Sequence, residues 1–248
     1  MLSEIFLPER IGTKRILSKK IISFSIENKT IRAAVVHVKR SKTTVEILLE
    51  QKIEFKDNAE YVEKAANAIK KIVSQVKRYD QIKVALPSSL VIFKELTMPF
   101  VDKEKIRMIL DYEIEATLPF SIEQAIADFI ITKQTKTKTE TSSQILVAIV
   151  RKEDLQNILD MYYAAGINPT SISIDLFAIY SIYQQIPEYE KITSCSTLID
   201  LGPTSTKVTF LQNGQLKLTR DIKKGIETIA KNIAADLGLS LKDVLTKI

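Results

Sequence analysis

The chain has 248 residues, of which 45% are hydrophobic and 27% charged, a composition typical of a globular protein with one large or two smaller domains. Its net charge of +6 is too moderate to indicate a nucleic-acid-binding protein, and no aromatic residues lie between the clustered lysines. A single cysteine excludes an internal disulfide. One histidine, His37, and one cysteine leave too few ligands for a zinc site, so we predict no metal-binding residues and a solvated His37.

No apolar run approaches the roughly 20 residues that a membrane-spanning helix needs. The first residues, MLSEIFLPERIG, have no basic segment and too short an apolar core for a signal peptide. The sequence therefore predicts a cytoplasmic protein. Whether the natural chain continues past Ile248 stays open.

The first part of the chain predicts a sheet followed by a helix. Three β-rich runs, Ile21 to Ile26, Ile31 to Val38 and Thr44 to Phe55, are separated by short polar links, which favours an antiparallel meander. Apolar residues recur with helical spacing from Tyr61 to Tyr79. The short run Ile82 to Leu86 then predicts a buried strand.

A smaller mixed region follows. Val91 to Leu96 predicts a strand, and Asp102 is a candidate N-cap for a helix. Asp128 to Thr132 and Gln144 to Val150 predict a hairpin, joined by the tract KQTKTKT at Lys133 to Thr139. Because this tract has no apolar side chains to bury, we expect it to form a mobile loop.

The last part repeats the order of the first. After a helix from Asp154 to Ala165, a short strand at Ser171 and a helix capped by Asp175, a second meander is expected. Its strands are Ser196 to Leu201, Thr206 to Leu211 and Gln215 to Ile222, with a hairpin turn at Asn213-Gly214 and a helix from Gly225 to Leu237.

Two hairpins of this repeat can be aligned at a constant offset. FSIENKTIRAAV, Phe24 to Val35, lies over IDLGPTSTKVTF, Ile199 to Phe210, so that Ser25 falls on Asp200. Chance could produce this likeness between two hairpins, but the shared element order favours a duplicated architecture. Duplicated α/β lobes with matching hairpins are typical of the actin-like (ribonuclease H-like) fold. We therefore predict this α/β fold, with an inserted α+β subdomain and an incomplete second lobe.

The predicted domains follow from this order. Residues 1–87 form the first lobe, residues 88–170 the inserted subdomain, residues 171–193 a strand and helix that return to the first lobe, and residues 194–248 the start of the second lobe. In the actin-like fold, two opposed turns bind phosphate through inward-pointing N–H groups. An Asp at the end of the first strand holds a metal-bound water, and a Gly two residues later admits the phosphate.

The order and spacing of these segments resemble the family of PilM and GspL, actin-like assembly proteins of type IV pili and type II secretion systems. The resemblance rests on the Met98-Pro99 step, the run E-x-E-x-x-x-P-F from Glu113 to Phe120, and the segment Leu198 to Ile229. It implies a cytoplasmic scaffold at the inner face of the bacterial inner membrane. The implied partner is a bitopic membrane protein of PilN type, or the GspL-type secretion partners including the assembly ATPase.

The resemblance also implies ATP with Mg²⁺ as the ligand of PilM itself. The residues it assigns to phosphate binding are Asp200, Gly202, Thr204, Ser205 and Thr206. The first hairpin departs from the family pattern D-I-G, since Ser25 replaces the Asp and Glu27 replaces the Gly. Glu27 places negative charge where phosphate would bind, and we expect Arg32 to lie too far along the strand to neutralise it. Pro203 also removes one N–H from the second turn.

Three functions stay open at this point. The first is an assembly scaffold with a degenerate nucleotide site and no ATPase activity. The second is an ATP-binding actin-like protein of the FtsA or PilM type that switches or polymerises with nucleotide. A sugar-kinase relative is disfavoured, because Ser25 removes the first acidic group and no catalytic-base motif stands out. The docking residues for a partner cannot be assigned from the sequence.

Overall fold

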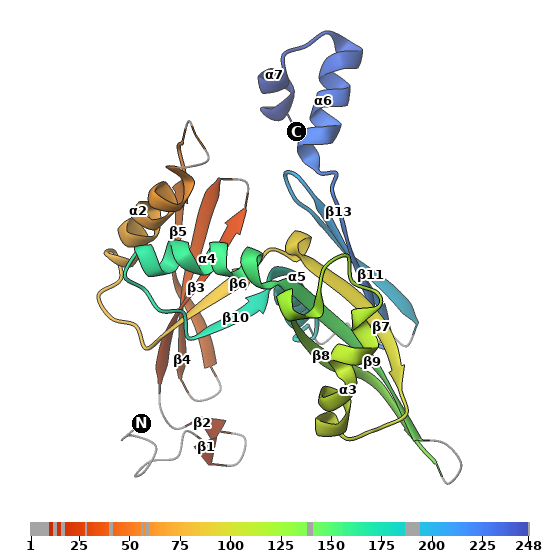
Figure 1. Ribbon diagram of the computed structural model, residues 1–248. Helices are drawn as coiled ribbons and strands as arrows, with labels where there is room; N and C mark the ends of the chain where they lie inside the picture. The colour runs from red at the N-terminus through yellow and green to blue at the C-terminus, as the bar shows by residue number, and fades with distance from the viewer. Residues whose placement is uncertain are drawn as a thin grey trace. The chain divides into compact units, whose positions relative to one another are not determined.

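The structure is a computed structural model, and it describes residues 10–11, 14–15, 18–27, 29–39, 42–55, 57, 60–137, 141–186 and 194–247 (Figure 1). The chain separates into two compact units. The first contains Met1–Pro87 and Gln156–Asp175, and the second contains Ser88–Leu155 and Leu176–Ile248. The four-part division expected from the sequence stays a prediction.

The first unit is built on a five-stranded mixed sheet with the order β10-β6-β3-β4-β5. Strands β3, β4 and β5 form the predicted antiparallel meander, whereas β3, β6 and β10 run parallel. The bounds are β3 Lys19–Glu27, β4 Thr30–Lys39, β5 Lys42–Lys52, β6 Gln81–Leu86 and β10 Ser171–Ile174. A two-residue pair, β1 Arg10–Ile11 with β2 Lys14–Arg15, precedes them.

Helices α2 (Tyr61–Val73) and α4 (Lys152–Ala164) supply the apolar partners of this sheet. Phe24 of β3 meets Tyr162 of α4 edge to face, with ring centroids 5.6 Å apart. The helix predicted to reach Tyr79 ends at Val73, so that prediction is too long. Val76 is still buried, because a turn after the helix can bury an apolar side chain as well as a helix can. The helical spacing of apolar residues therefore continues beyond the end of the helix at Val73.

The second unit begins with a three-stranded antiparallel sheet of order β7-β9-β8 and helix α3. The bounds are β7 Val91–Met98, α3 Lys103–Glu115, β8 Ala125–Lys136 and β9 Thr141–Arg151, with short 3₁₀ turns at Ser88–Leu90 and Ile122–Gln124. Asp102 is the N-cap of α3, as predicted, and accepts hydrogen bonds from the amides of Glu104 and Lys105. Ile106, Leu110 and Ile114 of α3 pack on the strands in one core cluster.

The lysine–threonine tract is not a loop over its first four residues, so that prediction is wrong there. Strand β8 continues to Lys136 and pairs with β9 as far as Thr141. Backbone pairing needs no apolar side chain, and Gln134 adds a 2.8 Å hydrogen bond to the carbonyl of Val101. Lys138 and Thr139 lie outside the described residues.

A second antiparallel meander of order β11-β12-β13 completes this unit. The bounds are α5 Asp175–Tyr183, β11 Cys195–Leu201, β12 Thr206–Gln212, β13 Gln215–Ile222, α6 Ile226–Leu237 and α7 Leu241–Leu245. Asn213 and Gly214 both have positive φ, 52° and 71°, the conformation that an Asn-Gly hairpin turn requires. The meander and its turn are confirmed.

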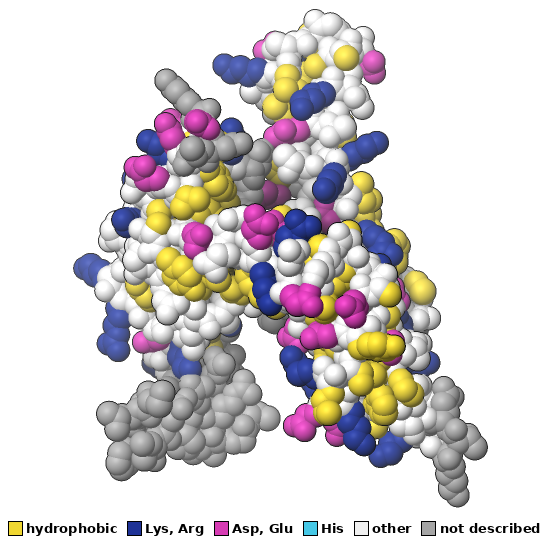
Figure 2. Space-filling model, viewed as in Figure 1, with side chains coloured by type: hydrophobic (Ala, Val, Ile, Leu, Met, Phe, Trp, Pro, Cys, Tyr) yellow, Lys and Arg dark blue, Asp and Glu magenta, His cyan; other side chains and the backbone are white. Residues whose placement is uncertain are grey.

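The surface seen in Figure 2 carries basic and acidic side chains interspersed over both units, with apolar side chains between them. His37 lies 3.4 Å from the carboxylate of Glu46. In the described part of the chain no three His, Cys, Asp or Glu side chains gather as a metal site would require. None of the helices described there has the length and apolar character to cross a bilayer.

Tyr162 offers a test of the first unit's core. Its side chain is fully buried, and its hydroxyl finds no hydrogen-bond partner among the described residues. Burial, with a smaller effect of Tyr61, raises the pKa of this hydroxyl far above its usual value. Tyr162→Phe keeps the aromatic contact and removes the unsatisfied hydroxyl, so we expect it to raise the free energy of unfolding by about 1 kcal/mol at neutral pH.

The pH dependence gives this variant a second readout. The unfolded chain releases the tyrosine proton near pH 10, whereas the folded chain retains it. Wild-type stability therefore falls as pH rises above about 10, and the Phe variant lacks this component. Urea unfolding at about pH 8 and about pH 11 measures both effects; a less stable variant, or a difference that does not widen at high pH, would contradict this description of the core.

Candidate phosphate-hairpin site

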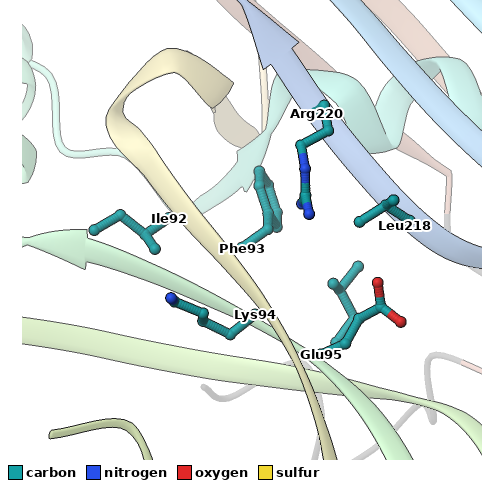
Figure 3. A pocket seen from close by; sticks show the side chains of 7 residues that line it. Ile92, Phe93, Lys94, Glu95, Leu218 and Arg220 are labelled. Atoms are coloured by element: carbon teal, nitrogen blue, oxygen red, sulfur yellow. The ribbon is translucent and has the colours of Figure 1, made fainter. Parts of the chain in front are cut away.

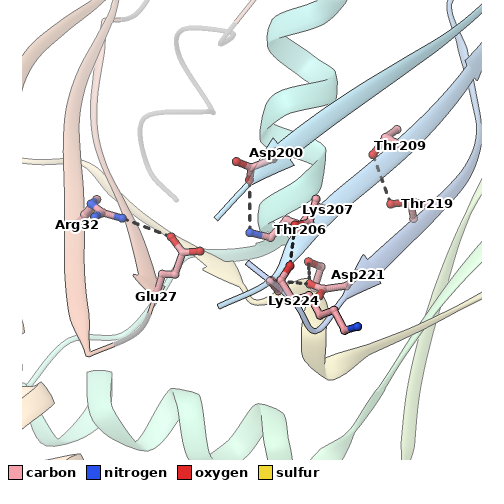
Figure 4. Close-up of polar contacts among 11 residues, drawn as sticks. Glu27, Arg32, Asp200, Thr206, Lys207, Thr209, Thr219, Asp221 and Lys224 are labelled. Atoms are coloured by element: carbon pink, nitrogen blue, oxygen red, sulfur yellow. Dashed lines mark hydrogen bonds and ion pairs between the residues drawn. The ribbon is translucent and has the colours of Figure 1, made fainter. Parts of the chain in front are cut away.

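The first hairpin, between β3 and β4, holds Ser25 and Glu27. Ser25 pairs across the strands with Arg32, and Glu27 pairs with Thr30. Arg32 donates from Nη1 to Glu27 Oε2 at 3.4 Å and from Nε to Glu50 Oε2 at 2.9 Å (Figure 4). The expectation that Arg32 cannot reach Glu27 is therefore wrong. Ser25 and Glu27 lie on one face of β3, and the strand pairing places Arg32 diagonally opposite Glu27 on that face.

This arrangement suits packing of the hairpin better than binding of a metal-bound nucleotide. Arg32 is shared by Glu27 and Glu50, so two carboxylates surround one guanidinium. Ser25 offers a neutral hydroxyl where Mg²⁺ sites use the charge of a carboxylate. The Glu27 carboxylate still lies where the family pattern has a glycine, which opposes an approaching phosphate.

The second hairpin lies in the other unit and joins β11 to β12. Asp200 lies in β11, Thr206 begins β12, and the turn Gly202 to Ser205 connects them. The Gly202 amide donates to the Ser205 carbonyl at 2.9 Å across the turn. The five residues assigned to phosphate binding therefore form one continuous hairpin end.

The start of helix α6 packs directly against this turn. The amides of Ile226 and Glu227 donate to the carbonyls of Gly202 and Pro203, at 3.0 and 2.9 Å. Gly225 is the N-cap, and a Cβ atom there would lie 2.4 Å from the Gly202 carbonyl oxygen. The first amides of a helix are the groups that bind anions when left unpaired. Here the turn itself occupies two of them.

The hydroxyl groups of the turn also have partners within the protein. Ser205 Oγ donates to Asp221 Oδ2 at 3.4 Å, and Ser88 Oγ donates to the same oxygen at 2.9 Å. Thr206 Oγ1 donates to the carbonyl of Lys224 at 2.7 Å. Thr204 is exposed. Two of the three hydroxyls expected to face phosphate therefore tie the turn to the end of β13.

Asp200 is paired with a buried lysine. Lys207 Nζ lies 3.5 Å from Asp200 Oδ2, and the lysine is only 8% exposed. A lysine this buried keeps its charge only with a carboxylate beside it. Asp200 thus compensates an internal cation, which competes with a role in holding a metal-bound water.

The turn was predictable from the sequence, but the side chains and helix amides that contact it were not. The sequence does not single out Asp221, Ser88 or Lys207 as partners of this turn. Gly225 after a strand was the available signal, since a glycine at a helix start permits close backbone approach. In the described part of the chain, the amides of Thr204 and Ser205 donate to no acceptor, so a small capacity for anion contact remains.

The comparison with protein families decides the identity. A family model described as type IV pilus assembly protein PilM matches residues 20–247. The chain belongs to the PilM family. The fold is the actin-like fold predicted from the hairpin repeat.

Two solved structures show the same fold. The structure of a PilM–PilN type IV pilus biogenesis complex matches with a TM-score of 0.75 and 19% identity, over 90% of this chain and 67% of that chain. The cytoplasmic domain of EpsL, an inner-membrane component of the type II secretion system of Vibrio cholerae, matches with a TM-score of 0.52 and 15% identity. That match covers 86% of this chain and 75% of the EpsL chain.

The close approach of α6 to the turn predicts that Gly225→Ala destabilises the protein. Gly225 has φ −136° and ψ −164°, which alanine also adopts, so the cost arises from the clash alone. We expect a loss of about 1–3 kcal/mol in the free energy of unfolding, measured by urea denaturation. Thr204→Ala, in the same turn but exposed, is the control and should change stability by less than about 0.5 kcal/mol. Equal midpoints for both variants would show that the turn does not pack on α6 as described.

Proposed function

We propose that this chain is a cytoplasmic actin-like scaffold at the inner face of the bacterial inner membrane. In this proposal it serves a type IV pilus assembly or type II secretion platform and docks the cytoplasmic segment of a bitopic membrane partner of PilN type. Membership of the PilM family supports the platform. The likeness to a PilM that forms a complex with PilN supports the kind of partner, and the likeness to EpsL supports the membrane context.

The same proposal holds that the nucleotide site is degenerate and that the chain does not hydrolyse ATP. The observation that carries it is that Asp200 and two hydroxyls of the second hairpin already have partners within the protein. Two turn carbonyls accept the first amides of α6, and Asp200 pairs with buried Lys207. Ser25 and Glu27 remove the metal-organising carboxylate and the glycine from the first hairpin. A metal ion held through Asp200 would have to compete with the contact between Asp200 and Lys207.

A second candidate is an ATP-binding switch of the FtsA or PilM type. It is favoured by the unused amides of Thr204 and Ser205 and by the exposed side chain of Thr204. Lys223 and Lys224 are also exposed near this end of β13. These groups support a weak phosphate contact. They supply neither a metal site nor a catalytic base, so the scaffold is the better-supported function.

Partner docking is tested with a synthetic peptide. The peptide carries the cytoplasmic segment of the bitopic membrane protein encoded beside this chain, and calorimetry measures its binding to the full natural protein. We expect saturable binding of one peptide per chain, since an extended segment can pair through its backbone and anchor apolar side chains. A peptide with the same composition in scrambled order is the control. No binding to folded protein, or equal binding of the scrambled peptide, would contradict the proposal.

A further inference from the structure

A groove lies along β7 and β13 in the second unit. It consists of two adjoining cavities of about 350 and 220 Å³, which share Phe93 and Arg220 (Figure 3). The first is lined by Ile92, Phe93, Lys94, Glu95, Leu146, Leu218 and Arg220. The second adds Ser88, Ser89, Val91, Thr219, Asp221 and Lys223. We call these two neighbouring cavities together the β7–β13 groove.

The groove follows the edges of strands and not their faces. Successive side chains of a strand point to opposite sides, yet consecutive residues from Val91 to Glu95 and from Leu218 to Asp221 line it. Figure 3 shows Phe93 directed toward Arg220 while Lys94 points to the other side of β7. Both β7 and β13 are the outermost strands of their sheets among the described residues. An outermost strand presents unpaired backbone N–H and C=O groups.

The floor of the groove is apolar and firmly held. Leu146 is buried in a core cluster that includes Tyr183, Leu211 and Leu216, and Phe93 packs against this cluster. Phe93 also meets Phe177 of α5 with ring centroids 6.4 Å apart. An apolar side chain of a bound segment can pack on these preordered residues, which lowers the free-energy cost of ordering the binding site.

Among the exposed side chains of the rim, positive charge exceeds negative charge. Arg220 and Lys223 are exposed, against one exposed carboxylate, Glu95. The other carboxylate, Asp221, already accepts hydrogen bonds from Ser88 and Ser205. Arg220 borders both cavities and forms no ion pair within the described residues. The rim therefore complements a guest with a negative charge close to an apolar residue.

We propose that the β7–β13 groove binds an extended segment of a partner protein in which an acidic residue neighbours an apolar one. The main chain of the segment lies along the edge of β7, where strand addition supplies backbone hydrogen bonds. The apolar side chain covers Phe93 and Leu218, and the carboxylate reaches Arg220. This inference stands on the geometry of the groove and does not depend on the proposed scaffold function.

The experiment selects peptides without assuming a partner. A random octapeptide phage library is panned against the full folded chain, and enriched sequences are synthesised with a fluorescent label. We expect enrichment of Asp or Glu beside an apolar residue, and binding measured by fluorescence anisotropy that weakens as salt is added. No enrichment, or enriched peptides without an acidic residue, would overturn the proposal.

A charge reversal locates the binding. Arg220→Glu should weaken the affinity for the selected peptide by roughly tenfold or more, because the peptide's carboxylate then lies beside another carboxylate. Lys105→Glu, which makes the same change at an exposed position of α3, should leave the affinity unchanged. Circular dichroism checks that both variants fold. If Arg220→Glu does not fold, Arg220→Gln replaces it in the binding measurement. If neither Arg220 variant changes peptide binding, the peptide binds elsewhere, for example at the second hairpin or at a contact between two copies of the chain. That result would contradict the assignment of the peptide to the β7–β13 groove.

Discussion

Two backbone hydrogen bonds, from the amides of Ile226 and Glu227 to the carbonyls of Gly202 and Pro203, determine how the second hairpin is used. They require the backbone at Gly225 to approach the turn more closely than any Cβ would allow. The turn therefore acts as the cap of α6. A turn that presents carbonyls to a helix N-terminus uses donors that an anion site would need, and the hydrogen bonds from Ser205 and Thr206 fix it in that position.

The charges of the two hairpins lead to the same conclusion by different means. In the first hairpin, Glu27 and Glu50 share Arg32, so both carboxylates are already paired. In the second, Asp200 compensates buried Lys207. An actin-like nucleotide site needs carboxylates that are free to organise a cation and turns that are free to receive phosphate. In this member of the PilM family, Asp200 and the hydroxyls of Ser205 and Thr206 are engaged in contacts within the protein, whereas the amides of Thr204 and Ser205 have no acceptor among the described residues.

The repeated meanders were predictable because strand alternation and the Asn213-Gly214 turn are local signals, and the structure has them where the sequence indicates. The contacts that decide the site were not predictable in this way. Arg32 reaches Glu27 through a cross-strand diagonal, and Ser88 reaches Asp221 over 133 positions of chain. Such partners depend on register and packing, which residue spacing does not encode. The end of α2 was missed for a related reason, since burial of Val76 does not require a helix.

The most direct test of a hairpin occupied by its own protein is calorimetric titration of the full natural chain with Mg·ATP. We predict no saturable heat at concentrations up to about 1 mM, which corresponds to a binding free energy weaker than about −4 kcal/mol. Saturable binding with a micromolar dissociation constant would contradict the account, because it would require the contacts around Gly202 and Asp200 to yield to nucleotide.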